Sequence, residues 1–162
     1  MHHDSEDGSL FAVDPARRRR PITGARAALS GYQKGHCFYC FSSLSLLSPS
    51  PPDVDHFFPH SLKAAGFGAA VDGVWNLVLS CPRCNRGAAG KSTRVPTLRL
   101  LERLNTRNEF LITSHHPLRE TLIAQTGAIE TERRRYLNRF HQQALAVLIH
   151  QWEPEQAQAP LF

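Results

Sequence analysis

Residues 53–60 read DVDHFFPH, residues 75–86 read WNLVLSCPRCNR, and residues 90–91 read GK. This one stretch contains a carboxylate able to bind a metal ion, a histidine able to act as a base, a polar asparagine and a Cys-x-x-Cys pair. A matching pair, Cys37 and Cys40, lies just upstream. The combination predicts a small domain that is organised around metal ions.

The four cysteines fall into two pairs, Cys37/Cys40 and Cys81/Cys84, and none is left over. Each pair places two thiolates at one tight turn, so the two pairs together predict a closed tetrahedral site for structural Zn²⁺. The alternatives are two buried cysteine pairs or a redox motif, but a redox motif needs only one pair in a thioredoxin-like setting. The zinc ion would clamp the segment before Phe41 onto the helix after Cys81.

The composition is that of an ordinary globular domain, since 41% of the 162 residues are hydrophobic and 20% are charged. The net charge is +5, and the excess comes from arginine more than lysine. Arginine suits phosphate contacts, so the composition predicts a polyanionic partner, but it does not separate a nucleic acid from an anionic membrane surface or a solvated basic face.

No apolar run has the length of a membrane span, and the N-terminus lacks the apolar core of a secretory signal. The sequence therefore predicts a cytoplasmic protein with reduced cysteines and no membrane partner.

The chain divides into four parts: a flexible basic arm over residues 1–21, a core with structural zinc over 22–96, a helical extension over 97–153 and a loose tail over 154–162. The arm shows no period of 2 or 3.6. Its arginines at 17–20 form either a solvated run or a segment that contacts phosphate.

Local patterns predict an α+β fold. The core should contain a short helix over 22–32, a strand end and loop over 41–52, strands over 53–58 and 74–79, and a helix beginning near Pro82 or Cys84. In the extension, apolar spacing predicts three helices: Leu98 to Ile112 with Arg99, Arg103 and Arg107 largely outside, Pro117 to Gly127, and Leu137 to Trp152 with Pro154 as its stop.

Asp55, His56 and Asn85 carry the candidate chemistry. Hydrolysis of a phosphodiester needs an activated nucleophile, which a neutral histidine can supply, and charge stabilisation, which a hard divalent cation can supply. Adjacent strand residues point to opposite faces, so Asp55 and His56 would share one site only where the strand bends or ends, as Pro59 allows. Asn85 follows the last cysteine, where its carbonyl oxygen could face Asp55 across a shared metal ion.

These residues resemble the HNH endonucleases. The pattern reads Asp55-His56, then Asn76 in WNL, then Asn85 in CNR. Over about residues 35–96 it is similar to bacterial zinc-stapled HNH proteins, and also to the HNH domain of RNA-guided CRISPR effectors. The resemblance implies a ββα-metal core with His56 as general base, Asp55 and Asn85 as ligands of the catalytic cation, and Asn76 as a brace for the loop that carries His56. The ordered combination of motifs is specific.

Two positions depart from the family pattern. Asn85 stands where many members have a histidine, and its amide oxygen favours Mg²⁺ or Mn²⁺ over Zn²⁺ or Ni²⁺ at the catalytic centre. Phe41 stands where a glycine commonly follows the first cysteine pair.

The sequence therefore predicts a metal-dependent endonuclease, and the resemblance implies 5′-phosphate and 3′-hydroxyl products from DNA. Arg83, Arg86 and Lys91 are the expected phosphate contacts. His60 is either a group that supports the site or an exposed loop residue. A double-strand break would need a homodimer or two encounters, and a partner protein could supply targeting. The alternatives are a non-catalytic, zinc-stabilised nucleic-acid-binding module and an RNase or toxin-like nuclease with the same site.

Overall fold

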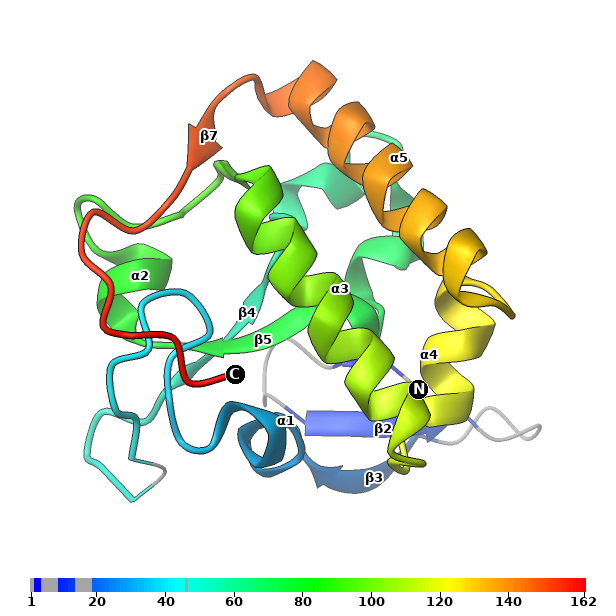
Figure 1. Cartoon of the computed structure of the whole chain (residues 1–162), viewed down its shortest axis with the longest axis horizontal. Helices are drawn as coiled ribbons and strands as arrows, with labels where there is room; N and C mark the ends of the chain where they lie inside the picture. The colour runs from blue at the N-terminus through cyan, green and yellow to red at the C-terminus, as the bar shows by residue number, and fades with distance from the viewer. Residues whose placement is uncertain (1, 4–8, 14–18, 46) are drawn as a thin grey trace.

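The computed structural model describes the backbone of residues 2–3, 9–13, 19–45 and 47–162, and side chains from Leu29 onward. Helices and small sheets alternate along this part of the chain, as Figure 1 shows, so the fold is mixed α and β. With η marking turns of 3-10 helix, the elements are β1 (His2–His3), β2 (Ser9–Val13), β3 (Arg19–Gly24), α1 (Ala25–Gln33), β4 (Asp53–His56), η1 (His60–Lys63), η2 (Gly68–Asp72), η3 (Val74–Asn76), β5 (Leu77–Ser80), α2 (Pro82–Arg86), β6 (Val95–Pro96), α3 (Leu98–Thr113), α4 (Arg119–Thr126), α5 (Glu130–Leu148) and β7 (Gln151–Trp152).

The antiparallel strands β4 and β5 lie at the centre of the molecule (Figure 1). Asp53 pairs with Ser80 and His56 pairs with Leu77, so the pairing stops at His56. The connection 57–76 then folds into three 3-10 turns before the chain returns as β5. Helix α2 begins at Pro82, a residue favoured in the first turn of a helix. Strand, loop, strand and helix thus follow in the predicted order.

Side chains cover the edge of β5 that β4 leaves open. Gln33, at the end of α1, accepts a hydrogen bond from the Leu79 N–H (2.9 Å) and donates to the Leu79 carbonyl (2.8 Å). Arg107 of α3 donates to the carbonyls of Leu77 (2.8 Å) and Trp75 (2.9 Å). Because an unpaired buried backbone group costs about 1–3 kcal/mol, these contacts allow a two-stranded sheet to lie in the interior.

The position of Arg107 corrects the prediction that the arginines of α3 lie outside. Its side chain is fully buried, and burial lowers its pKa to about 10. Arg103 is half-buried, where it donates to the Tyr39 carbonyl (2.9 Å) and lies 4.2 Å from the centroid of the Phe41 ring. Only Arg99 of the three is exposed. Helical spacing locates the apolar face of α3. It does not show that backbone carbonyl groups of Trp75 and Leu77 need a hydrogen-bond donor, which Arg107 supplies.

Helices α3, α4 and α5 pack against one another, with α5 along the outer side of the molecule in Figure 1. Phe140 of α5 contacts the connection 57–76: its ring centroid lies 4.8 Å from those of Phe58 and Phe67 and 5.0 Å from that of Trp75. The helical extension therefore holds the connection that follows His56 in place.

Helix α5 ends earlier than predicted, because Ile149 adopts a left-handed backbone with φ of 66°. Trp152 is not on the helix but on β7, which pairs in parallel with β6. The Trp152 indole donates to the Ala89 carbonyl (2.7 Å) and packs edge-on against Tyr39, with ring centroids 5.1 Å apart. The spacing of Trp152 from the apolar residues of α5 fits a helix, but its contacts with Ala89 and Tyr39 hold it on β7.

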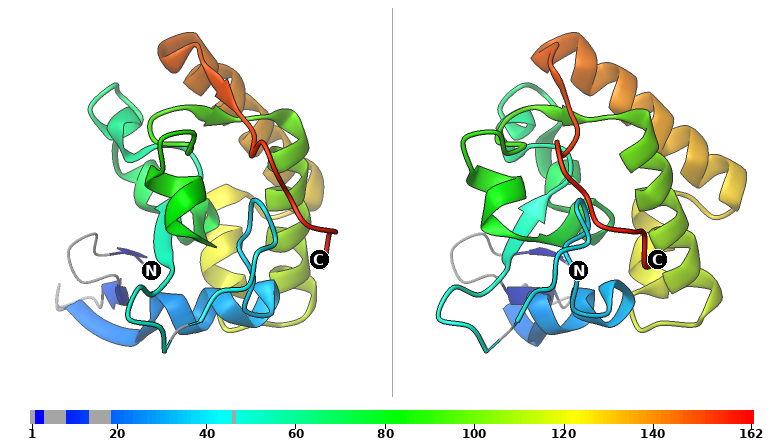
Figure 2. Two further views of the ribbon diagram at one scale, coloured as in Figure 1. Left: turned by 90° about the vertical axis from the view of Figure 1, so that its left-hand side faces the viewer. Right: turned by 60° about the vertical axis from the view of Figure 1, so that its left-hand side comes forward.

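The tail over 154–162 is not loose, which corrects a second expectation. It runs back along the molecule beside α2 and ends near α1, as the views in Figures 1 and 2 show. The Gln158 N–H donates to the Cys40 carbonyl (2.9 Å). The ring of Phe162 lies 4.9 Å from that of Phe41 and 5.2 Å from that of Tyr32. A terminal aromatic residue therefore anchors the tail by burying apolar surface.

The N-terminal arm differs from its prediction in the residues that the structure describes. Ser9–Val13 and Arg19–Gly24 form an antiparallel pair, with Val13 opposite Arg19. Residues 1, 4–8 and 14–18 lie outside the described part, and with them the first two of the four arginines.

No helix of the described residues combines the length and the apolar character needed to cross a membrane.

Candidate functional site

The four cysteine sulfur atoms converge, with all Sγ atoms within 4.8 Å of one another. Cys37 and Cys40 lie in the turn after α1, Cys81 directly precedes α2, and Cys84 lies in α2; all are buried except Cys81, which is partly exposed. The Cys81 N–H donates to Cys37 Sγ (3.4 Å), and hydrogen bonding to Cys37 lowers the pKa of the Cys81 thiol to about 6. Four thiols at this separation can hold a Zn²⁺ ion in a closed site.

Phe41 closes the turn that presents the first two sulfur atoms. Its φ of 60° is left-handed, a conformation that favours glycine and costs other residues about 1–2 kcal/mol. The Phe41 N–H donates to the Cys37 carbonyl (3.0 Å), and its ring is held between the Arg103 guanidinium and the ring of Phe162. Phe41 thus has a backbone conformation typical of glycine although its side chain is large. The contacts of its ring with Arg103 and Phe162 offset the cost of this conformation.

Asp55 lies in the interior, where its carboxylate already has two partners. The Tyr39 hydroxyl donates to Oδ2 (2.6 Å), and the Lys91 ammonium lies 3.3 Å from Oδ1. All three side chains are buried, with only 1% of Lys91 exposed. Burial raises the pKa of Asp55, while the charge of Lys91 and the hydrogen bond from Tyr39 oppose that rise. Lys91 therefore neutralises a buried carboxylate here, and it does not lie at the surface as a phosphate contact would.

Asp53, on the same face of β4 as Asp55, is the residue that meets Asn85. Asn85 Nδ2 and Arg86 Nε both donate to Asp53 Oδ2, each at 3.0 Å. The side chain of Arg86 is 68% exposed, so this arginine remains available to a phosphate. The arrangement joins the start of β4 to α2.

Asp55 and Asn85 do not form the predicted cation site in this arrangement. Their oxygens are of the right kind, since Mg²⁺ and Mn²⁺ prefer carboxylate and amide ligands. The Asp55 oxygens, however, are engaged by Tyr39 and Lys91, and Asn85 bonds to Asp53 instead. A cation bound at Asp55 would have to displace the Lys91 ammonium.

His56 faces the connection 57–76, on the side of β4 opposite to Asp55. Its Nε2 lies 3.4 Å from Asp72 Oδ1, and its ring centroid lies 5.1 Å from that of His60. Burial tends to raise the pKa of Asp72, but the hydrogen bond and charge of Lys63 and the charges of both histidines outweigh it and lower the pKa. An ionised carboxylate therefore lies beside a histidine that is only 11% exposed.

Asn76 ties the two ends of this connection together. Its Oδ1 accepts from the Phe58 N–H (2.8 Å), and its Nδ2 donates to the carbonyls of Phe58 (3.0 Å) and Val71 (2.8 Å). Phe58 lies two residues after His56, and Val71 directly precedes Asp72. The amide thus sets the separation between the segments that carry the histidine and the carboxylate.

Replacing Asn76 by alanine is expected to lower the free energy of unfolding by about 3 kcal/mol, because it leaves a buried N–H and two carbonyls without their partner. Urea denaturation measures the change. Asn138→Ala, at an exposed position of α5, is the control and should stay within about 0.5 kcal/mol of wild type. A loss below about 1 kcal/mol for Asn76→Ala would contradict the bracing role.

Gly73 leaves room for the side chain of Trp75 directly after Asp72. A Cβ atom at this position would lie 2.4 Å from Cδ1 of the Trp75 side chain. Trp75 is itself fixed, because its indole donates to the Ala70 carbonyl (3.1 Å) and its ring packs on Phe140. A side chain at residue 73 would therefore push the segment that carries Asp72 out of place.

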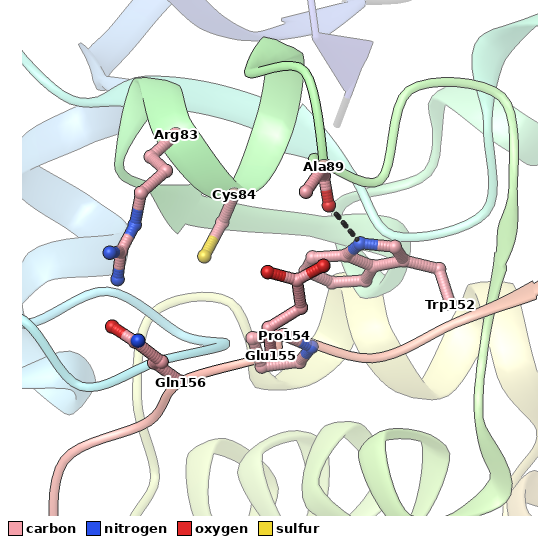
Figure 3. A pocket seen from close by; sticks show the side chains of 7 residues that line it. All are labelled: Arg83, Cys84, Ala89, Trp152, Pro154, Glu155 and Gln156. Carbon is pink, nitrogen blue, oxygen red and sulfur yellow. Dashed lines mark hydrogen bonds between the residues drawn. The ribbon is translucent and has the colours of Figure 1, made fainter.

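Arg83 lies over the cysteine cluster, where a hydrogen bond to Cys40 raises its pKa. It lines a cavity of about 230 Å³ together with Cys84, Trp152 and the C-terminal residues 154–156. Figure 3 shows Arg83 reaching from α2 toward this C-terminal segment. Its guanidinium favours the thiolate form of the neighbouring sulfur atoms, and its predicted contact with phosphate stays a prediction.

Three contact residues were missed by the sequence analysis: Tyr39, Asp53 and Asp72. Strand alternation could have indicated Asp53, because residues 53 and 55 lie on one face of β4. No local pattern marks Asp72, which is brought to His56 only by the fold of the connection 57–76.

Comparison with protein-family models, with curated proteins and with solved structures gave no match.

Proposed function

We propose that this chain is an endonuclease of the HNH type that hydrolyses phosphodiester bonds in DNA, with His56 as the general base. The observation that carries the proposal is the position of His56: it ends β4, beside the ionised carboxylate of Asp72, in a strand–loop–strand–helix unit that the four-cysteine cluster adjoins. The order of these elements, strand, loop, strand and helix, supports the proposal because it is the order that the resemblance implies.

In the proposed reaction the His56 imidazole accepts a proton from water, and the resulting hydroxide attacks phosphorus in line while the bond between phosphorus and the 3′ oxygen breaks. The departing 3′ oxygen takes a proton from solvent. Asp72 lies 3.4 Å from His56 Nε2, so its negative charge would orient the ring and stabilise the imidazolium that forms. Arg86 is exposed next to α2 and would contact a phosphate of the bound strand. The expected products carry a 5′-phosphate and a 3′-hydroxyl.

Dependence on a divalent cation is part of the proposal, because hydrolysis of a phosphodiester generally needs the charge at phosphorus to be neutralised. Asp55 does not offer free oxygens for such an ion in the present arrangement, since Lys91 and Tyr39 engage both of them. A cation at Asp55 would therefore have to compete with Lys91 for the carboxylate.

The test is cleavage of supercoiled plasmid and of structured RNA by the purified protein with Mg²⁺, Mn²⁺ or EDTA. Nicked plasmid that requires a divalent cation supports the proposal. Cleavage of RNA alone would replace it with the RNase alternative. Arg86→Gln is expected to weaken cleavage and binding, whereas Arg99→Gln, at another exposed arginine that also pairs with an acid, serves as the matched control.

One observation favours a second candidate, a non-catalytic nucleic-acid-binding module. The buried Lys91–Asp55 pair closes the position where the resemblance implies a catalytic cation. A protein that binds DNA and RNA but cleaves neither with any of the metals would support this reading.

A further inference from the structure

Three side chains of metal-binding type meet where β4 ends. Nε2 of His56 and Nε2 of His60 each lie 3.4 Å from Asp72 Oδ1. The ligand atoms of all three residues lie within 4.8 Å of one another, although they come from β4, η1 and η2. The cluster is separate from the four cysteines.

We propose that His56, His60 and Asp72 form a second metal site, which binds a divalent transition-metal ion such as Zn²⁺. Two imidazoles and one carboxylate are ligands typical of Zn²⁺, and three protein ligands leave a coordination position for water. Mg²⁺ prefers a shell of oxygen atoms, so two imidazoles select against it.

The fold organises this cluster before any ion arrives. Asn76 ties Phe58 to Val71, which fixes the segments that carry His56 and Asp72. Gly73 leaves room for the Trp75 side chain next to the segment that carries Asp72. The Nε2 atoms of His56 and His60 already lie near the same carboxylate oxygen of Asp72. Small movements of the side chains therefore bring all three ligands to the metal–ligand distance of about 2 Å from one ion.

The site is open to solvent on one side. The side chain of His60 is 51% exposed, whereas those of His56 and Asp72 are 11% and 16% exposed. An ion can therefore enter past His60. Lys63 donates to the other oxygen of Asp72 (2.6 Å), and its positive charge opposes a dication at this site.

Occupancy of this site would control the proposed nuclease. A metal ion bound to Nε2 of His56 leaves the one proton of the neutral ring on Nδ1, so neither ring nitrogen can accept a proton and the residue cannot be ligand and base at once. Zn²⁺ is therefore expected to inhibit cleavage. This consequence rests on the proposed function, but the binding of the metal does not.

Binding is tested on full-length protein that holds one equivalent of Zn²⁺ in the cysteine cluster, as verified by metal analysis. Titration with Zn²⁺ by calorimetry, and with Co²⁺ by visible absorption, should show a second ion whose cobalt spectrum lacks sulfur-to-metal charge transfer. His60→Ala should weaken this second binding at least about tenfold. His150→Ala, at an exposed histidine outside the cluster, should bind like wild type.

Lys63→Gln tests the same site by a gain of affinity. Removing the ammonium frees one oxygen of Asp72 and removes a repulsive charge, so the second ion should bind up to about fivefold more tightly. A circular dichroism spectrum like that of wild type shows that a variant is folded.

The proposal would be overturned if folded His60→Ala bound the second ion with the same stoichiometry and affinity as wild type. It would also be overturned if wild type bound no second ion. If the protein cleaves DNA, Zn²⁺ should inhibit folded His60→Ala less than it inhibits wild type, when each rate is compared with that of the same protein without Zn²⁺. If it cleaves nothing and still binds the second ion through His60, the metal site stands while the proposed function fails.

Discussion

Replacing His56 by alanine is expected to slow cleavage of DNA by about 10²- to 10⁴-fold, the usual contribution of a general base. The variant lacks the imidazole that is proposed to accept the proton of the attacking water. The affinity for DNA should change little, because the proposed phosphate contact, Arg86, lies on α2 and bonds to Asp53. Single-turnover cleavage measures the rate, and filter binding or fluorescence anisotropy measures the affinity.

His150→Ala is the matched control and should cleave at the wild-type rate. Asp72→Asn should lie between wild type and His56→Ala, because it removes the charge that stabilises the imidazolium but keeps the imidazole. Cleavage by folded His56→Ala at the wild-type rate would exclude His56 as the base. If loss of cleavage in this variant came with an equal loss of DNA affinity, the role of His56 would be in binding.

Removing the zinc ion from the cysteine cluster is expected to unfold the core. Apparent binding energies of structural Zn²⁺ are about 10–16 kcal/mol in zinc-finger peptides, which matches or exceeds the total stability of about 5–15 kcal/mol of a typical domain. The cluster joins the turn after α1 to the start of α2, and the Gln158 N–H bonds to the carbonyl of Cys40. Loss of the ion should therefore release both the hairpin and the tail.

Thermal melting with and without a strong chelator measures this effect, and re-addition of Zn²⁺ should restore the transition. Cys40→Ser should behave like the chelated protein, because one hydroxyl replaces one thiolate ligand. Ser42→Ala, which removes only a hydroxyl 3.1 Å from Cys40 Sγ, is the milder control. Coincident melting curves with and without the metal would show that the thiols alone hold this region together.

Part of the site could be predicted because it depends on neighbours in the sequence. The two cysteine pairs, the strand that begins at Asp53 and the helix that begins near Pro82 follow from local spacing and turn chemistry, and the structure contains each of them, although the strand ends at His56 and not at Phe58. Strand alternation alone puts Asp55 and His56 on opposite faces. The expected bend before Pro59 does not bring them into one site, because β4 stays paired with β5 through His56.

The sequence by itself thus determined the hairpin, the helix after it and the gathering of four cysteines, because each rests on contacts within a few residues or on one metal-binding pattern. Only the tertiary structure decided the partners of the charged groups. Lys91 turns inward to Asp55, Arg107 reaches the carbonyls of β5, and Asp72 comes to His56 from a loop. A buried charge or carbonyl must find a partner wherever the folded chain offers one, and that partner is fixed by packing in three dimensions and not by position in the sequence.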